Sequence, residues 1–209
     1  MVEKTLRKTD RRTIYTKTVI KDALLELMQK RRFTKITVTS VCKHAEVTRA
    51  TFYLHFDDLM AVLDEILEEA LQITENVSVT SNENMRQILY LITKGEKDLE
   101  KLKEYGSLLP ACQRIADLPK YRVLFLDESL SNYIINKMFQ SEKDKMVPLL
   151  MQYCQLSPKK AEMIFLFAIY GSFAVNKKLG WKKDEEWYAI QGNLLRFILG
   201  GMDALSPSS

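Results

Sequence analysis

The chain has 209 residues, of which 46% are hydrophobic and 28% charged, as is typical of a globular protein rather than a disordered one. It contains only seven glycines and five prolines, and a fold of many strands needs those residues for its turns. These numbers disfavour a β-rich fold, and we therefore expect an all-α fold.

The charge is distributed unevenly along the chain. Residues 1–60 hold thirteen Lys and Arg against seven Asp and Glu, a balance of +6, whereas the whole chain carries +4. A basic segment ahead of a near-neutral remainder is typical of a small nucleic-acid-binding module.

The sequence shows little that is typical of disulfide-rich, secreted or membrane-spanning proteins. The three cysteines, at positions 42, 112 and 154, are widely spaced and indicate core thiols rather than a disulfide framework. The first twelve residues have no apolar segment behind their charges, so we expect no secretory signal. The longest near-apolar stretch, Met163–Val175, is too short to span a bilayer core of about 30 Å. We expect a soluble, cytoplasmic protein without a membrane partner.

The first sixty residues predict four helices. Residues 13–30 have apolar side chains at helical spacing. Thr37 and Thr48 are candidate N-caps of two further short segments, the second running to Phe56 with Phe52 pointing inward. Asp57 and Asp58 favour the start of a fourth helix that continues to about Ile73.

The remainder predicts a second helical region. Residues 74–84 are polar and are interpreted as a connection. Helical patterns follow near residues 85–103, 107–117, 120–140, 142–155, 158–179 and 184–203. Prolines at positions 110, 119, 148 and 158 mark expected breaks between them. Residues 161–175 are apolar nearly all round, which predicts a helix buried on more than one side. The segment 171–187 is expected to pack around Trp181.

The most informative stretch is 36–62, ITVTSVCKHAEVTRATFYLHFDDLMAV. Its pattern predicts two short helices separated by a tight turn, a unit whose second helix fits the DNA major groove. The candidate DNA-binding residues are Thr37, Thr39, Thr48, Arg49, Ala50, Thr51, Tyr53 and His55. Small side chains at 50 and 51 allow close approach to DNA, while Arg49 can donate to guanine or phosphate.

This stretch resembles the DNA-binding domain of the tetracycline-repressor (TetR/AcrR) family, whose pattern runs roughly T-V-x-x-I-A-x-x-A-G-V-S-x-G-T-x-Y-x-H-F. The matching residues are Thr37-Val38, Val41, Ala45, Val47, Thr48, Thr51-Phe52-Tyr53 and His55-Phe56. The resemblance implies a helix-turn-helix DNA-binding domain over 1–56, a connecting helix over 57–73 and a helical dimerisation and effector-binding domain over 74–209. It also implies a homodimer formed through the last two helices, which would bind a palindromic operator in double-stranded DNA.

Two positions depart from the family pattern. Glu46 stands where glycine is common, in a turn that often needs a positive φ, and this costs a non-glycine residue about 1 kcal/mol. The sequence leaves open whether this turn is built differently. Leu59 stands where a lysine often contacts phosphate. Basic residues ahead of Thr13 are candidates to compensate, either in a groove or as a solvated tail: Lys4, Arg7, Lys8, Arg11 and Arg12.

Three kinds of function were compared. The leading hypothesis is a transcription repressor released by a small-molecule effector, and the alternative is an adaptor of the same fold that acts through a protein partner. An enzyme is not expected, because the chain has no nucleophile–base pair, paired carboxylates or glycine-rich phosphate loop. Cys42, His44 and His55 fit no usual zinc spacing, so we expect no metal or other cofactor. The many aromatic residues after position 85 suit either a core or a pocket, and no effector-binding residue is named.

Overall fold

The computed structural model describes residues 8–75 and 111–206, and every regular element within these two segments is helical. The first segment contains α1 (Lys8–Met28), the 3₁₀ turn η1 (Phe33–Lys35), α2 (Val38–His44), α3 (Arg49–Tyr53) and α4 (Leu59–Glu75). The second contains α7 (Ala111–Ala116), α8 (Arg122–Leu126), the 3₁₀ turn η3 (Glu128–Leu130), α9 (Ser131–Cys154), α10 (Pro158–Lys178) and α11 (Glu185–Leu205). The predicted all-α fold is confirmed for these residues.

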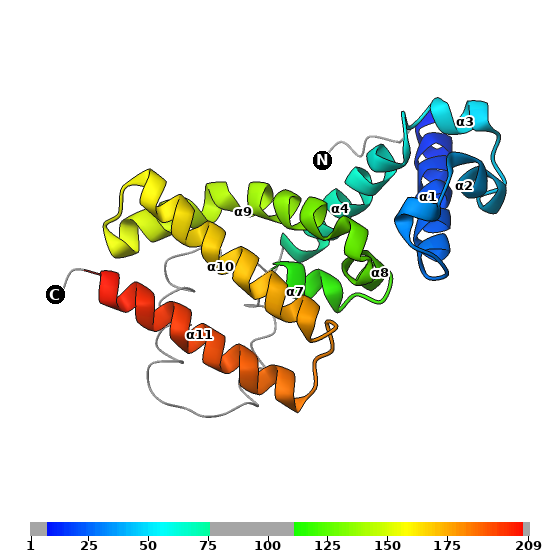
Figure 1. Cartoon of the computed structure of the whole chain (residues 1–209). Coiled ribbons are helices and arrows are strands. Elements are labelled where there is room, and N and C mark those ends of the chain that lie inside the picture. Colours follow the sequence, from blue (N-terminus) through cyan, green and yellow to red (C-terminus); the bar gives the residue numbers. More distant parts are fainter. Residues whose placement is uncertain (1–7, 76–110, 207–209) are drawn as a thin grey trace.

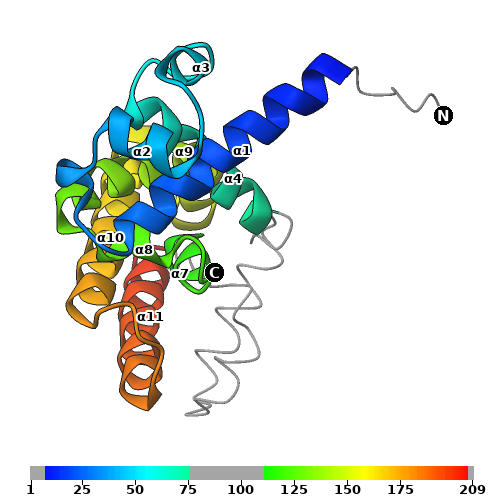
Figure 2. The same ribbon diagram turned by 90° about the vertical axis from the view of Figure 1, so that its right-hand side faces the viewer.

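The helices form two groups joined by α4 (Figure 1). We call α1, α2 and α3 the head, and α7 to α11 the body. The N-terminal part of α1 projects away from both groups (Figure 2). In the body, α9 and α10 pack against each other, and α8 also contacts α1 of the head. The head therefore touches the body directly and not only through α4.

The core of the head forms where α1, α2, α3 and α4 present apolar side chains to one another. Ile20 and Leu24 on α1, Val41 on α2, Phe52 on α3 and Leu63 on α4 are each completely buried. These positions follow the helical spacing that the sequence predicts. Buried apolar side chains continue from here into the body as a single cluster.

Three aromatic side chains pack against one another in tilted and edge-on geometries at the turn between α10 and α11. The Trp181 ring centroid lies 4.8 Å from that of Phe125 on α8 and 5.1 Å from that of Phe173 on α10. Trp181 is only 4% exposed, although it has a positive φ of 55°. The predicted packing of Trp181 in this segment is confirmed.

Several predicted boundaries are corrected. α1 begins at Lys8 rather than Thr13, so the basic residues at 8, 11 and 12 lie on a helix. Pro148 does not end a helix but lies inside α9, which replaces the predicted division near residue 141. The N-terminal part of the predicted 120–140 helix consists instead of α8 and η3. The predicted helix at 85–103 and most of the predicted connection at 74–84 lie outside the described residues.

The predicted burial of residues 161–175 on more than one side is wrong for the single chain. α10 buries the face that carries Phe165, Ile169 and Phe173. Its other face exposes Met163 (47%) and Phe167 (66%). An apolar helix face of this kind is therefore open to a further contact.

Candidate nucleic-acid interface

Two threonines fix where the short helices α2 and α3 begin. Thr37 Oγ1 accepts a hydrogen bond from the Ser40 N–H at 3.1 Å, and Ser40 Oγ accepts from the Thr37 N–H at 3.0 Å. This reciprocal pair satisfies two backbone donors at the start of α2. Thr48 Oγ1 accepts from the Thr51 N–H at 3.0 Å and caps α3 in the same way. Both predicted N-caps are confirmed.

The turn between these helices has a left-handed residue at its centre. Glu46 has a φ of 53°, so the turn adopts the positive φ even though the residue is not glycine. The chain then returns toward α2, because the Val47 N–H donates to the Cys42 carbonyl oxygen at 3.0 Å. The turn therefore has a positive φ at a residue that is not glycine, at the cost of backbone strain at Glu46.

Phe52 determines which face of α3 is exposed. Its side chain is fully buried, and its ring lies edge-on to Tyr53, with centroids 5.4 Å apart. Arg49 and Ala50, on the outer side of the helix, are exposed. The Arg49 guanidinium lies 5.9 Å from the Tyr53 ring centroid, a cation–π geometry that orients both side chains. One exposed face of α3 thus carries a cation and a phenol hydroxyl.

The eight candidate DNA-binding residues fall in three places. Five belong to α3 and its cap: Thr48, Arg49, Ala50, Thr51 and Tyr53. The exposed Thr37 and Thr39 lie at the start of α2, and the half-buried His55 lies in the turn after α3. The structure therefore places five of the eight together. Tyr53, the aromatic residue among these five, is 48% exposed.

The three candidate metal ligands have separate surroundings. The Cys42 thiol is buried, which raises its pKa, and it lies 4.0 Å from the Thr48 carbonyl oxygen. His44 Nε2 lies 2.6 Å from a carboxylate oxygen of Glu26, so this histidine links the end of α2 to α1. Within residues 8–75 and 111–206, no group of three metal-ligating side chains is placed to hold a metal ion. Cys42 packs in the core of the head, and His44 links α2 to α1.

Exposed basic residues of the head lie at positions other than 59. Leu59 begins α4 and packs against the core, while the Asp58 carboxylate caps this helix by accepting from the Ala61 N–H at 2.8 Å. The exposed Arg12 lies near the start of α1. Lys43, exposed in the last turn of α2, is a basic residue that the sequence analysis missed. Its position opposite the buried face of α2 is the helical-spacing signal that could have identified it.

Two buried side-chain amides in the body hydrogen-bond to each other but do not satisfy all of their polar atoms. Gln113 on α7 and Gln191 on α11 are 2% and 3% exposed, and Gln113 Nε2 donates to Gln191 Oε1 at 3.0 Å. Within the described segments, Gln113 Oε1 and Gln191 Nε2 have no hydrogen-bond partner. A buried polar atom without a partner costs about 1–3 kcal/mol. The sequence analysis missed this pair, because the two glutamines are 78 residues apart.

The predicted core thiols are confirmed for the body. Cys112 is 2% exposed and Cys154 is 3% exposed. Burial raises the pKa of both thiols, that of Cys112 to about 12. Neither thiol is therefore prepared for nucleophilic or redox chemistry at neutral pH.

Comparison with known proteins does not assign a family or a function to the chain. No protein-family model matches the chain, and no curated protein matches it. None of the helices in the described segments is long and apolar enough to cross a membrane. A functional proposal must therefore be argued from α2, α3 and the contacts that hold them.

Proposed function

We propose that this chain is a sequence-specific DNA-binding transcription regulator of the tetracycline-repressor type, with α2 and α3 as its helix-turn-helix. The observation that carries the proposal is the exposed face of α3. A capped helix begins at Arg49, Phe52 anchors it in the core, and Arg49, Ala50 and Tyr53 face solvent. A helix that presents a cation, a small side chain and a hydroxyl group suits the major groove and its phosphate rims.

The proposed DNA contacts divide into two kinds. Arg49 donates to a guanine edge or to a phosphate, and Tyr53 donates its hydroxyl to a phosphate oxygen. The exposed Lys43 and Arg12 add sequence-independent attraction to the backbone. Leu59 makes no such contribution, so these cations take the place of the lysine found there in the family.

We propose that the regulator is a homodimer formed through α10 and α11. Both helices lie on the same outer side of the body (Figures 1 and 2). The exposed face of α10 carries Met163, Phe167 and Tyr170, and α11 exposes Phe197 to 69%. Burying these side chains against a second copy would give two heads related by a two-fold axis. Two α3 helices about 34–36 Å apart would then read a palindromic operator.

Release from DNA by a small-molecule effector is proposed as the mode of regulation. The buried atoms Gln113 Oε1 and Gln191 Nε2 support it, because they offer one acceptor and one donor to a small molecule with the complementary pair. The required coupling between effector and operator is about 1–3 kcal/mol. Effectors that leave operator affinity unchanged would contradict this part of the proposal.

The test is selection of random duplex DNA at low salt by the purified chain and by Tyr53→Ala. Wild type should enrich a palindrome, and Tyr53→Ala should lose most of that enrichment because the phosphate donor and the support for Arg49 are both removed. Tyr53→Phe, which keeps the ring, should fall between the two. Leu126→Ala is the matched control, since Leu126 is similarly exposed, at 53%, but lies on α8.

Two results would overturn the DNA-binding proposal. One is that wild type enriches no sequence at low salt, where phosphate contacts are strongest. The other is that Tyr53→Ala enriches the same palindrome as well as wild type does. The first result, combined with recovery of a stoichiometric protein partner, would favour the adaptor function instead.

A further inference from the structure

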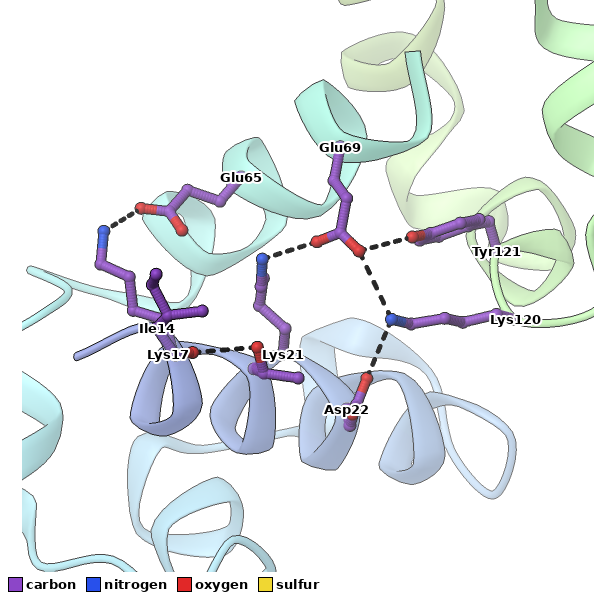
Figure 3. Close-up of polar contacts among 9 residues, drawn as sticks. Ile14, Lys17, Lys21, Asp22, Glu65, Glu69, Lys120 and Tyr121 are labelled. Carbon is purple, nitrogen blue, oxygen red and sulfur yellow. Dashed lines mark hydrogen bonds and ion pairs between the residues drawn. The ribbon is translucent and has the colours of Figure 1, made fainter. Parts of the chain in front are cut away.

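A network of five polar side chains joins the head to the body around Glu69 (Figure 3). The Glu69 carboxylate lies 2.6 Å from Lys21 Nζ and 3.6 Å from Lys120 Nζ. It also accepts a hydrogen bond from the Tyr121 hydroxyl at 2.9 Å. Lys120 closes the network with an ion pair of 3.1 Å to Asp22.

The members of this network come from three separate parts of the fold. Lys21 and Asp22 are neighbours on α1, which carries the head. Glu69 lies on α4, and Lys120 and Tyr121 precede α8 in the body. On α1, Lys21 is thus paired with the carboxylate of Glu69, and its neighbour Asp22 is paired with the ammonium group of Lys120. This arrangement is satisfied at one rotation of α1 and not at others.

Two side chains of the network are largely buried and three are partly exposed. Lys21 is 14% and Tyr121 3% exposed, whereas Glu69, Lys120 and Asp22 are 36%, 42% and 44% exposed. Burial by itself raises the pKa of Glu69, but hydrogen bonds from Lys21 and Tyr121 outweigh it and leave the pKa below its ordinary value. The carboxylate is therefore ionised at neutral pH, and its partners are held by it.

A second contact one helical turn away provides an internal comparison. Lys17 Nζ lies 2.5 Å from Glu65, again between α1 and α4 and with the same sequence separation as Lys21 and Glu69. Neither Lys17 nor Glu65 is paired with a body residue in Figure 3. The two glutamates thus make the same kind of α1–α4 ion pair, and only Glu69 extends it to the body.

A separate hydrogen bond attaches the head at another point. The Phe33 N–H, at the start of η1, donates to Asp127 Oδ2 of the body at 2.6 Å. Two attachments at different points prevent α1 from pivoting about either one. Loss of the Glu69 network would leave the Phe33–Asp127 hydrogen bond and the contacts between α1 and α8, and we expect these alone to hold the angle of the head less tightly.

We propose that Glu69 is a positioning residue that fixes the angle between head and body, and thereby the spacing of the two half-sites that the dimer accepts. The inference rests on the proposed function, since it concerns how two heads are placed on one operator. Glu69 touches no DNA itself. Its loss should relax the spacing requirement while leaving the preferred bases of each half-site unchanged.

The test selects palindromes from a library in which the separation between half-sites varies. Wild type should prefer one separation, and Glu69→Ala should lower that preference by about 1.4-fold to fivefold, the factor for one partly exposed ion pair. Glu69→Gln, which keeps a hydrogen-bond acceptor, should be intermediate. Glu65→Ala is the matched control and should keep the wild-type separation.

A measurement without DNA separates head positioning from loss of stability. Spin labels at Lys43→Cys and Asp144→Cys, both exposed positions, report the head–body distance, and the three native cysteines are buried. The distance distribution should broaden in Glu69→Ala and remain narrow in Glu65→Ala. If Glu69→Ala fails to fold, the double change Lys120→Met and Tyr121→Phe removes both body contacts to Glu69 and should give the same broadening.

Each outcome decides between the two proposals. An unchanged separation and an unchanged distance distribution in Glu69→Ala, with wild type selecting a palindrome, would overturn the positioning role alone. Equal effects from Glu65→Ala would overturn it too, because the body link would then be irrelevant. If wild type selects no palindrome, the DNA-binding proposal fails and the spacing role falls with it.

Discussion

Replacing Glu46 with glycine should make the protein more stable. A left-handed backbone costs a non-glycine residue about 1–2 kcal/mol, and Glu46 has a φ of 53°. Glycine removes this cost but loses more conformational entropy on folding, by about 0.5–1 kcal/mol. The Glu46 side chain is exposed and makes no hydrogen bond or ion pair with the described residues, so little else is lost. The expected net gain is about 0.5–1 kcal/mol.

Denaturant unfolding measures this gain, together with a rise in Tm of about 1–4 °C for a chain of this size. Gln155→Gly is the matched control, since Gln155 is exposed, has a φ of 50° and ends α9 far from α3. It should stabilise the protein by a similar amount. Gly180→Ala, at a φ of 62°, should have the opposite sign. A loss of stability in Glu46→Gly would refute the claim that strain at this turn is relieved.

Two further changes test contacts that are distant in the sequence. Asp127→Ala should destabilise the chain by about 1–3 kcal/mol at neutral pH, because the Phe33 N–H loses its acceptor. Burial raises the pKa of Asp127, but donors from Phe33 and Ser129 outweigh it and lower the pKa overall. The stabilisation by Asp127 is therefore present above the unfolded pKa of about 3.9 and is lost as the pH falls through the folded pKa. Asp127→Ala should accordingly make the free energy of unfolding depend less on pH in the acidic range. Gln191→Leu should destabilise the chain because it strands the Gln113 amide, whereas the double change to leucine at 113 and 191 should recover most of that loss in denaturant unfolding. Additive losses from the two glutamine changes would contradict the pairing.

The local signals in the sequence predicted the head well. Thr37 and Thr48 were identified as caps because a cap needs only residues three positions away, and Phe52 as a core residue because helical spacing determines its face. The starts of α2 and α3 follow from these same local rules, whereas α3 ends at Tyr53 and not at Phe56 as predicted. Glu46 marks their limit, since the sequence indicated a conflict at the turn but not how the chain would accommodate it.

α9 shows why a local rule failed in the body. Proline has no N–H and conflicts with the carbonyl four residues earlier, so Pro148 predicted a break. In the structure Pro148 and Asp144 are both exposed, which places the freed carbonyl on the side of α9 that faces water. A helix packed along α10 tolerates the proline there, because the lost hydrogen bond is on the solvent side.

The contacts that attach the head to the body could not be predicted from spacing. Glu69 lies 48 residues from Lys21 and 52 from Tyr121, and each of these residues alone would read as an ordinary exposed or half-buried side chain. Only the fold brings them together. For the same reason, the exposed apolar face of α10 could not be separated by sequence from a fully buried helix.

The segment from Gln113 to Asp127 joins the interior of the body to contacts with the head. At one end, Gln113 hydrogen-bonds to α11, and at the other Asp127 accepts from the backbone of η1. Lys120 and Tyr121, between these ends, reach the Glu69 carboxylate. If an effector changes the pairing at Gln113, as the proposed regulation requires, we expect this segment to transmit the change to both attachments of the head. Because the attachments are weak individually, a displacement that costs about 1–3 kcal/mol in operator affinity is within their range.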